Sequence, residues 1–247
     1  FIGGKEFNFG GGLFISGANN KSFFNNCIFH NFNGTNNRKN KLNNLNDRII
    51  YGALNFFDTE IKIINSKFIS IEAEDALNII SSNFEITNNS FKNVSYDAID
   101  VDFGKGFINN SNFNLIGNDA IDFSGSHVEI KDINFSNIGD KIISIGEKST
   151  ININNIKGQN AKVGLASKDG SKVFADKISF SNVKYPFAAY KKKKEYKYGQ
   201  IFLNEYLSID HDHEFVHDKG SLIYDNLNDK KLFNSNSNYK KILKLII

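Results

Sequence analysis

Three stretches of the chain, DALNI at 75–79, DAIDV at 97–101 and DAIDF at 119–123, nearly repeat one another and begin 22 residues apart. Apolar residues keep the same interval behind them in two further series, Phe91, Phe113 and Phe135, and Ile86, Ile108 and Ile130. Within each repeat, apolar and polar residues alternate and are interrupted by Asn, Gly, Ser and Asp, which is the pattern of short strands joined by turns. A strand-rich period of this length predicts a solenoid whose coils stack on one another.

With three short strands in each coil, every strand pairs with its equivalent in the next coil, and this arrangement is a parallel β-helix. Helical repeats are disfavoured because β-branched and aromatic residues are dense and the runs between turn residues are short. A leucine-rich repeat is disfavoured because its leucine and asparagine consensus is missing. We therefore predict an all-β fold, a right-handed parallel β-helix with about 22 residues per coil.

The repeat extends upstream to GGLFI at 11–15 and is broken in two places. Residues 36–50, rich in Asn and Lys, predict an insertion that bulges from one coil. Beyond Tyr190 the repeat loosens into a polar segment, and the end of a solenoid needs a cover over its unpaired edge. We assign residues 1–206 to the β-helix and residues 207–247 to a C-terminal cap or extension.

Composition narrows the classes of partner. The net charge of +3 is small, and the positive charge is almost all lysine, with Arg38 and Arg48 as the two arginines. Because arginine forks are favoured for reading nucleic acid, we expect no nucleic-acid partner. A single cysteine rules out an internal disulfide. No apolar run approaches the roughly 20 residues of a membrane-spanning helix, so no transmembrane segment is expected.

The first strand of each coil has an outward side that stacking alone does not dictate. In residues 97–102, Ile99 and Val101 should point inward, which leaves Asp100 and Asp102 on the outside. Equivalent residues of successive coils then form columns with a spacing of about 4.8 Å. The sequence predicts a ligand-binding face at these outward positions, formed by Asp100, Asp102, Asp122, Ser124, Ser144, Lys168 and Tyr190.

Stacked aspartates repel one another by about 1 kcal/mol per pair in water, and by more in a less polar setting. Backbone N–H donors, a shared proton, lysines or a bound cation offset such repulsion. Oxygen ligands suit Ca²⁺, so Asp97, Asp100, Asp119 and Asp122 are candidate calcium ligands, and no other cofactor is indicated. The competing interpretation is that Asp97 and Asp119 accept backbone N–H groups at turns while Asp100 and Asp122 are solvated.

Two further chemical hypotheses concern catalysis and metal binding. Asp100 and Asp122, with Lys168 as the base, are the candidate catalytic residues, although the lack of arginine on this face counts against a lyase. His211, His213 and His217 form a second cluster that a strand would place on one side, where they would be candidate metal ligands. A solvated polar stretch is the favoured interpretation of the histidines, since no fourth ligand stands out.

Four segments carry a resemblance to a known family: DAIDFSGS at 119–126, IGEKS at 145–149, GLASKDGS at 164–171 and AAYKK at 188–192. Over roughly residues 52–200 the chain resembles the right-handed parallel β-helix (PbH1) repeat proteins of the pectate-lyase-like superfamily. More narrowly, it is similar to a bacterial subgroup found with spore-coat-protein-H-like kinase domains. The resemblance implies an extracellular or cell-envelope protein connected with polysaccharide, and it supplies no catalytic residues.

The chain departs from the superfamily in two ways that count against an enzyme. It lacks the Asp-Pro-His motif of alginate epimerases, and it lacks the Gly-Asp-Asp setting of polygalacturonases. The first hypothesis is therefore a non-catalytic surface β-helix that binds or organises a polysaccharide or a surface protein. A polysaccharide lyase, hydrolase or epimerase that acts on acidic glycans is the first alternative. A segment of a phage or adhesin fibre is the second.

Overall fold

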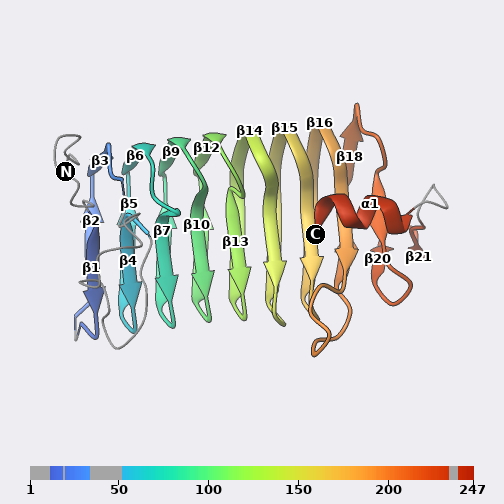
Figure 1. The fold of residues 1–247 in the computed structure, drawn as a ribbon, viewed down its shortest axis with the longest axis horizontal. Coiled ribbons are helices and arrows are strands. Elements are labelled where there is room, and N and C mark those ends of the chain that lie inside the picture. Colours follow the sequence, from blue (N-terminus) through green and yellow to red (C-terminus); the bar gives the residue numbers. More distant parts are fainter. Residues whose placement is uncertain (1–11, 19, 34–51, 234–238) are drawn as a thin grey trace.

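The computed structural model describes residues 12–18, 20–33, 52–233 and 239–247. These residues form a right-handed parallel β-helix of about eight coils with about 22 residues per coil, as the repeat predicts. Figure 1 shows the coils side by side along the long axis of the molecule, in sequence order. The predicted insertion at 36–50 lies outside the described residues.

Each coil contributes a first, a second and a third strand. The first strands are β1 (Leu13–Ser16), β4 (Leu54–Phe57), β7 (Asp75–Ile80), β10 (Asp97–Asp102), β13 (Ile121–Ser124) and β19 (Phe215–His217). The second strands are β2 (Ser22–Asn25), β5 (Glu60–Ile64), β8 (Asn83–Thr87), β11 (Lys105–Asn109), β17 (Gln200–Leu203) and β20 (Leu222–Asp225). The third strands are β3 (Ile28–His30), β6 (Lys67–Ile71), β9 (Ser90–Val94), β12 (Asn112–Ile116) and β18 (Tyr206–Ile209).

Three long strands replace these short ones in the middle of the solenoid: β14 (His127–Gly146), β15 (Thr150–Lys168) and β16 (Lys172–Tyr190). Each begins as a second strand, continues as a third strand and ends as the first strand of the next coil. For example, β14 pairs in parallel with β11, then with β12, then with β13. The outward side of the first strands therefore continues without interruption from β7 to β16.

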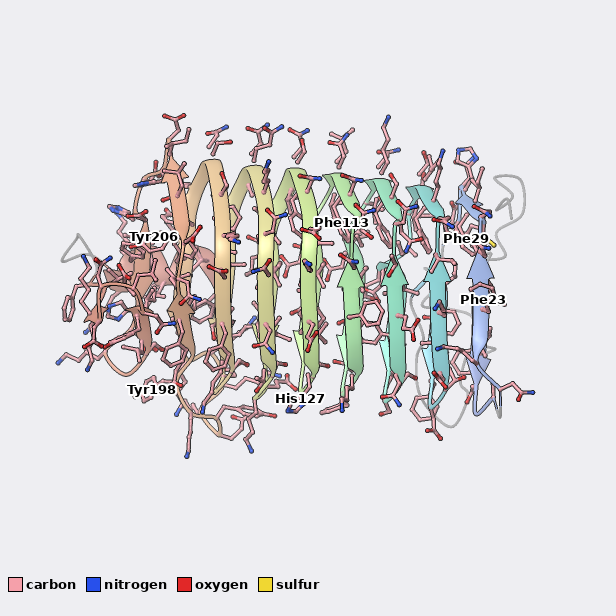
Figure 2. All side chains as sticks on the ribbon, turned by 180° about the vertical axis from the view of Figure 1, so that it is seen from behind. Phe23, Phe29, Phe113, His127, Tyr198 and Tyr206 are labelled. Carbon is pink, nitrogen blue, oxygen red and sulfur yellow. The ribbon has the colours of Figure 1, made fainter. Side chains whose placement is uncertain are left out.

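The core is built from inward columns of apolar side chains. Ile99, Val101 and Ile121 are fully buried, which matches the inward positions predicted from alternation. One column consists of stacked phenylalanine rings, Phe29, Phe68, Phe91, Phe113 and Phe135, with centroids 4.4 to 5.0 Å apart. Phe29 and Phe113 are labelled in Figure 2. This burial accounts for the repeat, and it leaves the outward positions free to vary.

Asparagine occupies the corners of the coils for two physical reasons. Asn65, Asn88 and Asn110 stand at equivalent corners with positive φ, a backbone region that asparagine tolerates better than most residues. Asparagine side chains also form hydrogen bonds from coil to coil. At another corner, for example, Asn160 Nδ2 donates to Asn137 Oδ1 at 2.9 Å. The corners therefore contain both left-handed turns and ladders of side-chain amides.

Parallel pairing of the coils extends past residue 207. Parallel pairing continues through β19, which pairs with β16, and through β20, which pairs with β17. The direction changes only where β20 pairs antiparallel with β21 (Lys230–Lys231). Helix α1 (Tyr239–Ile246), red in Figure 1, then lies across the strands at this end. Within the described residues, no helix has the length and apolar character needed to cross a membrane.

Candidate functional site

The register of the first strands builds the predicted columns on the outward side. Asp100 pairs with Asn78 in the preceding coil and with Asp122 in the following one, and Asp122 pairs with Ser144. Asp102 pairs with Ser124 in the neighbouring column. Asp75 and Asp97 begin β7 and β10, and Asp119 lies two residues before β13. We call the six carboxyls together the acidic face: Asp75, Asp97, Asp100, Asp102, Asp119 and Asp122.

Two of these carboxylates are held by the fold itself. Asp97 Oδ1 accepts the backbone N–H of Asp119 at 2.8 Å and the side-chain amide of Asn118 at 2.7 Å. One coil later, Asp119 Oδ1 accepts the backbone N–H of Lys141 at 2.9 Å. Each carboxylate thus links one coil to the next, which is the role that the capping interpretation predicts for Asp97 and Asp119.

The remaining outward carboxylates have no such role. Asp100 and Asp102 form no side-chain hydrogen bond or ion pair with any described residue. Asp122 has one close contact, from Lys168 Nζ to its Oδ1 at 3.6 Å. These side chains are partly exposed, and no contact within the coil accounts for their charge.

Unpartnered polar atoms continue along the same column. Asn78 Oδ1, Asp122 Oδ1 and Ser144 Oγ are buried, and none has a hydrogen-bond partner among the described residues. Ser144 is completely buried. Asn78 and Ser144 stand on either side of Asp100 and Asp122, so the unsatisfied acceptors span four successive coils at one position of the first strand.

Burial and mutual repulsion make several carboxyls of the acidic face hold protons more tightly. Burial, with repulsion from Asp119, raises the pKa of Asp97 from its usual 3.8 to about 7. Burial raises the pKa of Asp119 to about 6, against the opposing effect of Lys141. Burial and neighbouring carboxylates raise the pKa of Asp75 and of Asp100 well above the usual value. Part of the face therefore stays protonated near neutral pH.

Two lysines border the acidic face on the side of the later coils. Lys141 Nζ lies 3.5 Å from Asp119 Oδ1 and also contacts the Asp140 carboxylate. The stem of Lys168 passes over Gly146, where an added Cβ would lie only 2.9 Å from Lys168 Cε. Because Gly146 has no side chain, the Lys168 ammonium can extend back over one coil towards Asp122.

Helix α1 covers the next part of the same side. Its Ile242, Leu243 and Ile246 lie in one buried apolar cluster with outward residues of β15, β16 and β19, which we call the helix-covered face: Val163, Ala166, Tyr185, Ala188, Tyr190 and Val216. Tyr190 is only 1% exposed, and its hydroxyl lies 3.5 Å from the carbonyl oxygen of Ile246. Burial raises the pKa of Tyr190 far above its usual range.

The accessible part of the face is therefore smaller than the sequence predicted. Asp100, Asp102, Asp122, Ser124 and Lys168 are partly exposed outward residues, as expected. Ser144 and Tyr190 also point outward, but both are buried, and α1 covers Tyr190. Alternation identifies the side on which a residue lies, and it carries no information about a distant helix that docks there.

Two residues of the site were not among the predicted site residues. Asp75 belongs to the acidic face and bonds Asn78 through its Oδ2 at 3.1 Å. Lys141 follows Asp119 by one period, so the series Asp75, Asp97, Asp119 and Lys141 was present in the sequence as a signal. Extending each column by 22 residues in both directions would have found the lysine.

The proposed metal ligands do not gather into a metal centre in the part of the chain that the structure describes. No group of three or more His, Cys, Asp or Glu side chains there is placed to hold a metal ion. This applies to Asp97, Asp100, Asp119 and Asp122 and also to the histidine cluster. His213 stacks on Tyr185 with ring centroids 6.3 Å apart, and His217 Nδ1 lies 2.8 Å from the carbonyl oxygen of Asp218, while His211 is exposed.

No protein-family model, no curated protein and no solved structure significantly matches this chain. The class of the protein is therefore defined by its fold, that of a parallel β-solenoid. The resemblance to the pectate-lyase-like superfamily and to its kinase-associated subgroup stays a prediction.

Proposed function

We propose that this protein is a non-catalytic carbohydrate-binding β-helix of the bacterial cell surface, and that an extended glycan lies along its acidic face. One observation carries the proposal. Asp100, Asp102 and Asp122 point outward from adjacent coils and receive no hydrogen bond from the described residues, whereas Asp97 and Asp119 beside them are bonded to the backbone. Asp100, Asp102 and Asp122 can therefore accept hydrogen bonds from a ligand.

Sugar hydroxyls are suitable donors for these carboxylates. Carboxylate oxygens accept hydrogen bonds, and bonds to an ionised acceptor are among the stronger ones. Equivalent acceptors recur about every 4.8 Å along the stacked strands, which suits a chain of repeating units. Lys168 and α1 limit the site on the side of the later coils. The cell-surface location rests on the family resemblance alone.

A glycoside hydrolase is the second candidate, favoured by one feature of the face. Asp100 and Asp122 occupy paired positions in adjacent coils, about 4.8 Å apart, and retaining glycosidases place their two carboxyls about 5 Å apart. A lyase that used Lys168 as its base has less support, because the Lys168 ammonium contacts the Asp122 carboxylate. No feature of the described residues specifically supports a segment of a phage or adhesin fibre.

Calorimetric titration with a panel of neutral, amine-bearing and uronate oligosaccharides tests the main proposal. Replacing Asp100 and Asp122 together by alanine should weaken binding at least tenfold, since both acceptors at the centre of the face are removed. The matched control is Glu129→Gln, an exposed carboxylate on the second-strand side of β14, which should bind as the wild type does. Unchanged binding by the double variant would refute the site.

Product analysis separates binding from catalysis. The wild-type protein is incubated with the oligosaccharides that it binds, and new reducing ends and unsaturated products are measured. Intact oligosaccharides support a binding protein. New reducing ends that vanish in Asp100→Asn or Asp122→Asn would instead support the hydrolase.

A further inference from the structure

We infer that the acidic face recognises a glycan with free amino groups, an amino-sugar polymer whose ammonium groups lie against Asp100, Asp102 and Asp122. This inference rests on the proposed carbohydrate-binding function and names its ligand class. Four features of the face lead to it: its charge, its unpartnered atoms, the position of Lys168 and the lack of a metal-binding geometry.

The first feature is a pair of carboxyls, Asp100 and Asp102, that lack a cation partner. The two lysines at the border contact Asp119 and Asp122, at 3.5 and 3.6 Å. Asp100 and Asp102, one coil earlier, have no ion-pair partner among the described residues. Neutral hydroxyls can bond to carboxylates, but they leave the charge in place, whereas an ammonium group both bonds and neutralises.

The second feature is a set of buried acceptors that no described residue satisfies. Ser144 is completely buried on the outward side, and its Oγ has no partner. Asn78 Oδ1 and Asp122 Oδ1 belong to the same column and are also buried without a hydrogen bond, although Asp122 Oδ1 has the ion-pair contact with Lys168. An ammonium group offers three donors from one atom, so it can serve acceptors in neighbouring coils.

The third feature is that the chain already places one ammonium on this face. Lys168 crosses over Gly146 and reaches Asp122 in the adjoining column. One coil earlier, the position equivalent to Lys168 is Gly146. A side chain there that followed the course of Lys168 would cross over Ser124 and reach Asp100. Glycine has no side chain to follow that path, so the place beside Asp100 is left for an ammonium supplied by a ligand.

The fourth feature concerns competing ligands. No three carboxylates of the described residues converge on a point where a metal ion would be held. A uronate would add its own negative charge to a face whose carboxyls already repel one another. An amine-bearing sugar chain has the opposite charge, and it can present amines repeatedly along the columns.

The test compares two ligands that differ only at their amino groups, which are free and charged in one and acetylated in the other. A hexamer of β-1,4-linked glucosamine and its N-acetylated counterpart are titrated into the wild-type protein at pH 6 by calorimetry, with a galacturonate hexamer as a third probe. We expect the free-amine hexamer to bind at least tenfold more tightly than the acetylated one, and the galacturonate to bind most weakly. The preference should shrink as salt is raised, because partly exposed charges are screened.

Variants then locate the amine. Asp100→Asn and Asp102→Asn keep the side-chain size and remove the charge, so each should reduce the preference for the free amine while binding of the acetylated hexamer changes little. The control Glu129→Gln should leave the preference intact. Circular dichroism and thermal denaturation confirm that each variant is folded.

The outcomes distinguish the inference from the function on which it rests. Equal binding of the free-amine and acetylated hexamers would overturn the inference and leave the carbohydrate-binding proposal standing. No binding of any glycan would overturn both. A lysine-rich peptide that binds as tightly as the free-amine hexamer would refute the assignment to a glycan. A preference that survives in both aspartate variants would refute the assignment to this face.

Discussion

The outward side of the first strands contains two regions with the same backbone and different surroundings. In β10 and β13 the outward positions carry Asp100 and Asp122, which are partly exposed to solvent. In β15 and β16 the equivalent positions are Ala166 and Ala188, which are completely buried next to α1. The inward residues are apolar in both regions. Stacking therefore constrains the interior, and the outward side is free to serve either the chain itself or a ligand.

The difference follows from the cost of burying charge. A carboxylate beneath α1 would lose its water without gaining a partner, so small apolar residues are required there. On the acidic face solvent still reaches part of Asp100, Asp102 and Asp122, and the remaining repulsion is tolerated. The boundary lies at Ser144 and Lys168, where a hydroxyl and a lysine separate the carboxylates from the helix.

The largest expected loss of stability comes from introducing a carboxylate beneath helix α1. Ala166→Asp would place a carboxylate in the apolar cluster with α1, and an unpaired buried charge costs about 3–5 kcal/mol. We expect α1 to detach and become sensitive to protease. The control Ser124→Asp, in the open region, should cost about 1 kcal/mol through repulsion by neighbouring carboxylates. Similar losses for the two variants would contradict the comparison, as measured by urea denaturation with limited proteolysis.

The next effect concerns the helix side of the same contact. Leu243 is 7% exposed in the cluster, so Leu243→Ala should destabilise the docked helix by about 2–4 kcal/mol. Leu245 is 56% exposed on the other side of α1, and Leu245→Ala should change stability by less than about 0.5 kcal/mol. Hydrogen exchange of the α1 amides measures both changes. Equal protection in the two variants would show that α1 is not held by this cluster.

A third prediction uses the raised pKa of Asp97. Because the pKa rises from 3.8 to about 7 on folding, the folded protein binds this proton more tightly than the unfolded chain does. The stabilisation is complete below about pH 4 and is lost as pH rises through about 7. At about 1.4 kcal/mol per pKa unit, reduced for partial exposure, we expect a loss of about 2 kcal/mol over that range.

The variant Asp97→Asn isolates this contribution. Asparagine keeps the Oδ1 acceptor that bonds the Asp119 backbone N–H, and it does not titrate. Thermal denaturation between pH 4 and pH 8 should therefore show a flatter dependence in the variant, by several degrees. An unchanged pH profile would mean that Asp97 does not supply the proton uptake.

The smallest expected effect concerns Gly146, which lies at the boundary between the two regions. Gly146→Ala would bring a Cβ within 2.9 Å of Lys168 Cε, and the flexible lysine should move away from Asp122. Stability should change by less than about 1 kcal/mol. The coupling between Lys168 and Asp122, measured with Lys168→Met and Asp122→Asn in a double-mutant cycle, should fall towards zero in this background. A retained coupling would show that the path over Gly146 is not needed.

Much of the site follows from the period of the sequence. Once the repeat places Ile99 and Val101 inside, Asp100 must lie outside, and the next coil brings Asp122 beside it. The same logic aligns Asp97 with Asp119, although only the structure shows that the first accepts the backbone N–H of the second. Hydrogen bonds of this kind depend on local angles that a period does not specify.

The sequence by itself determined the coil, its interior and the side on which each aspartate lies, because alternation and a constant period act over neighbouring residues and identical strands. Tertiary structure alone decided what remains open on that side. Helix α1 is more than 40 residues away in sequence from Tyr190 and buries it, and the stem of Lys168 reaches Asp122 only because it can cross over Gly146. Contacts between such distant segments depend on shape and solvent exclusion, which leave no periodic trace in the chain.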